Sequence, residues 1–118
     1  MAYAFDHEKL DVYRLSLQFI GWSQRLLKVI PGSCRNSRSQ LIRSSDSIPL
    51  NIAEASGKRP GLDRKRYFET ARASATECAA TLDVLVARGA RTEDEVQEGK
   101  LLLHRIVSIL TRLAPPNE

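Results

Sequence analysis

Two pairs of polar residues in this sequence have the types and the spacing that could hold a proton or a metal ion. The pairs are Asn51 with Glu54 and Ser74 with Glu77. Each contains a carboxylate, its two members are three residues apart, and it lies beside an apolar stripe of helical period. A carboxylate in that position meets a neighbouring helix, and burying it without a partner costs several kcal/mol. The spacing therefore predicts a structural polar network between two helices, formed by Asn51, Glu54, Ser74 and Glu77.

A metal site or a catalytic site is the alternative interpretation of these carboxylates. Metal sites in helical bundles add a histidine three residues after a glutamate, and neither His7 nor His104 follows a glutamate at that spacing. Cys34 and Cys78 lack C-x-x-C spacing, and no Ser/His/Asp or Cys/His arrangement is visible. The sequence thus predicts no metal, no cofactor and no catalytic residue, and hence a protein that is not an enzyme.

A basic segment, G-K-R-P-G-L-D-R-K-R over residues 57–66, separates the two pairs. Asp63 is the one acidic residue of this segment. The cations of the segment are Lys58, Arg59, Arg64, Lys65 and Arg66. Three of them begin a predicted helix, where positive charge opposes the helix dipole, so we expect a phosphate ligand to be the reason for their presence. A solvated turn is the plain alternative. Only two aromatic residues follow, which gives base stacking little support.

The composition is that of one soluble domain over residues 1–118. Hydrophobic residues make up 42% and charged residues 27%, and the net charge is +4. No apolar run approaches the ~20 residues of a membrane span, and no basic segment followed by an apolar stretch opens the chain. We therefore expect a cytoplasmic protein with two free thiols and no membrane partner.

The elements that must position these residues are helices. Capping residues, apolar periodicity and Gly/Pro signals predict helices over about 7–29, 38–56, 64–88 and 93–113. The connections between them are short, so consecutive helices should be antiparallel. The fold class predicted is all-α, an up-down-up-down four-helix bundle.

The first helix carries two apolar seams, whereas a monomeric bundle needs only one. One seam contains Leu10, Tyr13, Leu17, Ile20 and Leu27; the other contains Val12, Leu15, Phe19, Trp22, Leu26 and Val29. A few exposed apolar residues would be the plain explanation. We instead expect a closed homo-oligomer. The interface is assigned to Val12, Leu15, Phe19 and Trp22.

Two motifs carry a resemblance to a known family. The segment S-I-P-L-N-I-A-E-A (residues 47–55) and the pattern A-x-x-S-x-x-E (Ala71, Ser74, Glu77) resemble those of small bacterial four-helix-bundle proteins encoded in intervening sequences of 23S ribosomal RNA genes. Phe5, Leu10, Val12 and Tyr13, and the Ile30-Pro31 pair, also fit. One departure is Ala55-Ser56-Gly57, since the family usually has glycine directly after the glutamate.

This family is similar to the accessory variability determinant protein of diversity-generating retroelements. That resemblance implies a ring-shaped homopentamer with a basic surface that binds RNA or DNA, and a reverse transcriptase as partner. Two functions remain open at this point. One is a nucleic-acid-binding oligomer, and the other is a protein-interaction scaffold whose basic corner docks an acidic protein partner.

Overall fold

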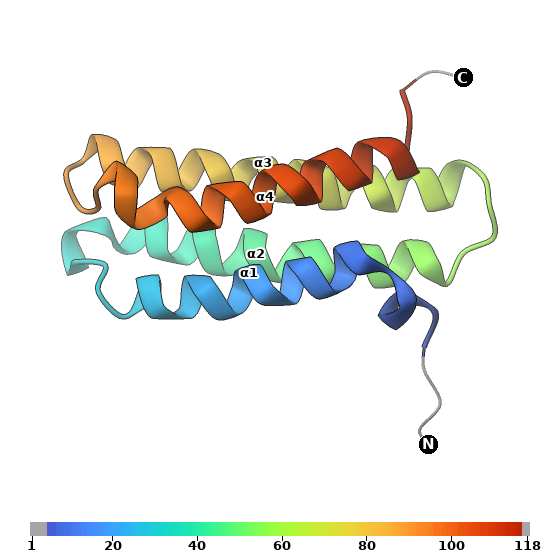
Figure 1. Cartoon of the computed structure of the whole chain (residues 1–118), viewed down its shortest axis with the longest axis horizontal. Coiled ribbons are helices and arrows are strands. Elements are labelled where there is room, and N and C mark those ends of the chain that lie inside the picture. The colour runs from blue at the N-terminus through green and yellow to red at the C-terminus, as the bar shows by residue number, and fades with distance from the viewer. Residues whose placement is uncertain (1–4, 117–118) are drawn as a thin grey trace.

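A computed structural model describes residues 5–116 as a bundle of helices whose consecutive members run antiparallel (Figure 1). Within this range there is no strand. The elements are η1 (Asp6–Lys9), α1 (Asp11–Leu27), η2 (Gly32–Cys34), α2 (Arg35–Ser56), α3 (Leu62–Ala87) and α4 (Glu93–Leu113), where η denotes a 3-10 helix. The predicted all-α four-helix bundle is confirmed. The predicted domain spans residues 1–118, of which residues 1–4 and 117–118 lie outside the described range. The start of the chain, where we expect no leader segment, therefore lies partly outside this range.

The helix ends follow local signals where a side chain caps the backbone. Thr92 Oγ1 accepts a hydrogen bond from the Glu95 backbone N–H (3.3 Å), and the Thr92 N–H donates to Glu95 Oε1 (2.8 Å), so the predicted start of α4 is confirmed. The other starts differ. Leu10 is extended and separates η1 from α1, while η2 leads directly into α2 at Arg35. None of these four helices is long and apolar enough to cross a bilayer.

The inner face of α1 is the seam that the sequence analysis assigns to the oligomer interface. Val12, Leu15, Phe19 and Trp22 are 1%, 8%, 0% and 8% exposed within the single chain, so their assignment as the oligomer interface is wrong. Both seams are apolar, and periodicity alone does not say which one faces the core.

Packing against α4 decides the orientation. Trp22 lies over Gly99, where an added Cβ would stand 2.3 Å from Trp22 Cζ3, and only glycine leaves that space. The middle of the opposite seam lies on the outside, with Leu17 45% exposed and Ile20 half-buried, whereas Tyr13 packs against the core and Leu27 is 5% exposed.

Small side chains line the interface between α2 and α3. The buried faces of the two helices contain Ser44, Ser45 and Ala55 on α2, and Ala71, Ser74, Ala75 and Cys78 on α3. Small residues permit close approach of two helix backbones, and they leave hydroxyl and thiol groups inside the contact. The polar chemistry of the molecule is therefore concentrated along α2 and α3 and at the turn that joins them.

Candidate nucleic-acid interface

The turn between α2 and α3 lies at one end of the bundle (Figure 1). Gly57 closes α2, with its N–H directed at the carbonyls of Ala53 and Glu54 (both 3.2 Å). Gly61 precedes α3 with φ +151°, a conformation that favours glycine. Gly61 has no side chain with which to cap α3. The first N–H groups of the helix, which form the positive end of its dipole, therefore lack an acceptor from the N-cap residue.

The five predicted cations are brought together at this turn. Lys58, Arg59 and Arg66 are exposed, and Arg64 and Lys65 are half-buried. Among residues 5–116, the ion pairs closer than 4.0 Å involve other cations: Lys9, Arg14, Arg43, Arg91 and Lys100. None of the five cations of the turn therefore forms an ion pair within the described chain, and the segment keeps a net positive charge despite Asp63.

Two aromatic rings in the first turns of α3 hold two of these cations. Lys58 Nζ lies 5.5 Å from the centroid of the Tyr67 ring, and Arg64 Cζ lies 5.6 Å from that of Phe68. Both distances are within the range of a cation–π attraction. Arg64 Nη1 also approaches the Lys58 carbonyl oxygen at 3.5 Å. Phe68 is 1% exposed, so packing in the core fixes the ring on which Arg64 lies.

The end of α4 borders the same turn, as the antiparallel topology requires. A hollow of about 410 Å³ is lined by residues 58–63, and a second, of about 210 Å³, has residues of both elements in its wall. The lining of the second is Pro60, Gly61, Arg64, Lys65, Leu113, Ala114 and Pro115. Arg112, exposed in the last turn of α4, therefore adds a cation at this end of the bundle. Only the antiparallel topology brings it there.

Two arginines nearer the opposite end of α2 are already engaged in the structure. The Arg38 guanidinium donates to the Leu27 carbonyl and so caps the C-terminus of α1. Arg43 contacts Gln40 and lies 3.8 Å from Glu77. These two side chains support the bundle and do not extend the basic surface of the turn.

The predicted polar network forms in part, because two of its four residues are connected through Ser47, which belongs to the same sequence motif as Asn51. Ser74 Oγ donates to Ser47 Oγ (2.7 Å), which also accepts from Asn51 Nδ2 (2.9 Å). Asn51 Nδ2 reaches the Ser47 carbonyl as well (2.8 Å). Asn51 and Ser74 are thus connected between α2 and α3, with Ser47 at the centre. The polar stripe of α2, on which Ser47 precedes Asn51 by four residues, was the signal for this role.

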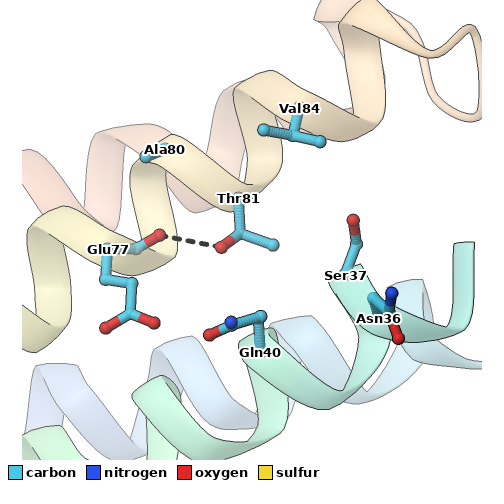
Figure 2. A pocket seen from close by; sticks show the side chains of 7 residues that line it. All are labelled: Asn36, Ser37, Gln40, Glu77, Ala80, Thr81 and Val84. Carbon is cyan, nitrogen blue, oxygen red and sulfur yellow. Dashed lines mark hydrogen bonds between the residues drawn. The ribbon is translucent and has the colours of Figure 1, made fainter.

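The two glutamates of the predicted network lie outside it. Glu54 and Glu77 are exposed, because both side chains extend from the flank of the α2–α3 contact toward solvent. Figure 2 shows Glu77 beside Gln40. Both residues line a groove between the two helices with a volume of about 310 Å³. Thr81 donates to the Glu77 backbone carbonyl (2.9 Å), and the carboxylate itself is 3.8 Å from Arg43. Both carboxylates are therefore hydrated by solvent and do not have the buried hydrogen-bond partners that the sequence predicts.

Cys78 continues the buried hydrogen-bonded row along the same seam. Its thiol donates to Ser44 Oγ (3.3 Å), and Ser44 donates to the Gln40 carbonyl (2.7 Å). Burial raises the pKa of the Cys78 thiol to about 11, so the group is neutral near pH 7. Cys34 is buried and free as well. Across residues 5–116, no three His, Cys, Asp or Glu side chains gather where they could bind a metal ion.

Comparison with known proteins agrees with this architecture. The family model of the 23S rRNA-intervening sequence protein matches residues 8–112. A crystal structure of a protein with unknown function from the S23 ribosomal protein family, from Bacteroides thetaiotaomicron, has the same fold, with a TM-score of 0.80 at 23% identity. That alignment covers 88% of this chain and 98% of the other. No curated protein matches the sequence. Because the family model spans nearly the whole described bundle, the chain belongs to the 23S rRNA-intervening sequence protein family.

Proposed function

We propose that this protein is a non-catalytic homo-oligomer that binds the phosphate backbone of RNA or DNA through the α2–α3 turn. The observation that carries the proposal is the set of five cations at one end of the bundle with no carboxylate of residues 5–116 within 4.0 Å of them. The positive potential of such cations remains available to attract an external polyanion. In nucleic acids, clustered Lys and Arg side chains bind the phosphate groups of the backbone.

The absence of an enzymatic activity is part of the proposal. Both thiols are buried, and the raised pKa of Cys78 removes the thiolate that a nucleophile needs. His7 packs beside Tyr13 with ring centroids 4.6 Å apart, and His104 is exposed on α4. Two unpaired buried cysteines also support a reducing compartment, so we place the protein in the cytoplasm.

Self-association is supported by the outer seam of α1. Leu17 is 45% exposed and Ile20 is half-buried on the same face, so these two side chains form an apolar ridge outside the core, whereas Tyr13 packs against the core. We assign this ridge to contact with a second copy, because the resemblance to the accessory variability determinant protein implies a pentameric ring. A ring would repeat the basic turn and multiply weak phosphate contacts into a higher avidity.

Charge reversal at the turn tests nucleic-acid binding. The triple variant Arg64→Glu, Lys65→Glu, Arg66→Glu should bind a labelled single-stranded RNA, and a DNA of equal length, far more weakly than the wild type. Since each phosphate contact contributes about one unit, the slope of log affinity against log salt should fall by about 3. Acidic residues suit a helix N-terminus, so the variant should retain its helicity in circular dichroism.

A second triple variant provides the matched control. Lys28, Arg35 and Arg88 are exposed at the opposite end of the bundle, and reversing all three changes the net charge by the same amount. This control should keep most of the affinity, because the proposal assigns binding to a place and not to the overall charge. Equal affinity of both triple variants and the wild type would contradict the proposal. If the wild type instead binds an acidic protein partner, such as a reverse transcriptase, and no nucleic acid, the scaffold function replaces it.

A further inference from the structure

The rings of Tyr67 and Phe68 are covered by cations, and this decides which part of a nucleic acid the turn can recognise. Sites that bind single strands usually place bases on aromatic faces. Here Lys58 Nζ lies 5.5 Å from the Tyr67 centroid and Arg64 Cζ lies 5.6 Å from the Phe68 centroid. A base that stacked on the Tyr67 face occupied by Lys58 would have to displace this cation, and Phe68, at 1% exposure, offers no face to a base.

The two rings differ in burial, and this difference separates fold from function. Phe68 is 1% exposed and belongs to the core, so its replacement would disturb the bundle itself. Tyr67 is half-buried, with its ring between the core and the turn. Lys58 reaches this ring from the other side of the turn, nine positions earlier in the chain. Tyr67 thus restrains a long side chain that would otherwise be mobile in solvent.

From these contacts we propose that Tyr67 is a positioning residue, which holds the Lys58 ammonium for a phosphate, and that the turn binds the sugar–phosphate backbone of a nucleic acid without contacting bases. The inference rests on the proposed function and specifies its ligand. Holding one long side chain in place before binding avoids a loss of rotamer entropy, which predicts a contribution of roughly two- to tenfold in affinity. A base-free polyanion of matched charge should then bind as well as RNA.

The experiment measures the dissociation constants of a labelled RNA and of inorganic polyphosphate of equal charge for the wild type, Tyr67→Phe and Tyr67→Leu. Tyr67→Phe keeps the ring face and should match the wild type for both ligands. Tyr67→Leu should weaken both ligands by the same two- to tenfold factor. The salt slope should not change, because no charge is removed. Circular dichroism and the thermal midpoint check that the leucine variant is folded.

A double-mutant cycle with Lys58→Met separates positioning from a direct contact. If Tyr67 acts through Lys58, Tyr67→Leu should have no further effect in the Lys58→Met background. A persistent effect there, or a loss confined to RNA with polyphosphate unaffected, would show that the ring meets a base and would overturn the inference. Equal affinities of wild type and Tyr67→Leu would also overturn it, while leaving the proposed function standing. A wild type that binds neither ligand would overturn both.

Discussion

Trp22 and Gly99 form the contact on which the orientation of α1 depends. An added Cβ at Gly99 would stand 2.3 Å from Trp22 Cζ3, and the Trp22 ring also packs on Phe19 with centroids 5.6 Å apart. The ring is 8% exposed, and its outer edge borders a hollow of about 230 Å³ that Arg25 and Glu95 also line. The contact is thus the residue-scale reason why the Trp22 seam faces inward.

We predict that Gly99→Ala lowers the free energy of unfolding by about 1–3 kcal/mol, because it overpacks this contact. Gly21→Ala is the control, since Gly21 is exposed in α1 with no heavy atom within 4 Å of an added Cβ. That change should raise stability by roughly 0.5–1 kcal/mol through the better helix propensity of alanine. Urea denaturation measures both, and equal shifts for the two variants would contradict the packing argument.

At the scale of the elements, α2 and α3 are joined by hydroxyl groups within a contact of small side chains. Ser47 Oγ accepts from Ser74 Oγ and from Asn51 Nδ2. Ser74 is 8% exposed, so loss of its acceptor would leave a buried donor without a partner. Such a group costs more free energy than the net gain of the hydrogen bond that it made.

We predict that Ser47→Ala lowers stability by about 1–3 kcal/mol. The double variant Ser47→Ala, Ser74→Ala should lose less than the sum of the single changes, with a coupling on the order of 1 kcal/mol. Ser39→Ala, at an exposed position of α2, should stay within about 0.5 kcal/mol of the wild type. Chemical denaturation of the four variants gives the coupling, and additive effects would argue against the observed Ser47–Ser74 bond.

At the scale of the whole molecule, the open question is what covers the outer ridge of α1. We predict that the wild type has a mass several times 13.2 kDa by light scattering at micromolar concentration, and that Leu17→Glu reduces it toward the monomer. A charged side chain in an apolar interface is costly because it loses its hydration. Helicity should be retained, since Leu17 is 45% exposed in the single chain.

Val84→Glu provides the control for this change. Val84 is 42% exposed on α3, close to the exposure of Leu17, but lies away from the α1 ridge. It should leave the mass unchanged. Phe19→Glu, by contrast, should unfold the bundle, because Phe19 is 0% exposed. A monomeric wild type would refute the ring, whereas an oligomeric Leu17→Glu would place the interface elsewhere.

The sequence by itself determined those features that depend on neighbouring residues. The Thr92–Glu95 cap, the helical periods and the short connections are local, and they predicted four antiparallel helices. The five cations adjoin one turn in the chain, so their gathering at one end also followed from sequence. The motifs around Asn51 and Ser74 pointed to the family for the same reason, since each lies within one helix.

Only the tertiary structure decided which face of α1 is buried and how far the polar flanks of α2 and α3 enter the contact. The two apolar seams on α1 are equivalent by periodicity. The seam with Trp22 faces inward because Gly99 on α4 leaves space for the Trp22 ring. Glu54 and Glu77 share a helix flank with buried serines, but their longer side chains reach solvent. Burial depends on the shape of the neighbouring element, which comes from a distant part of the chain and which no local pattern contains.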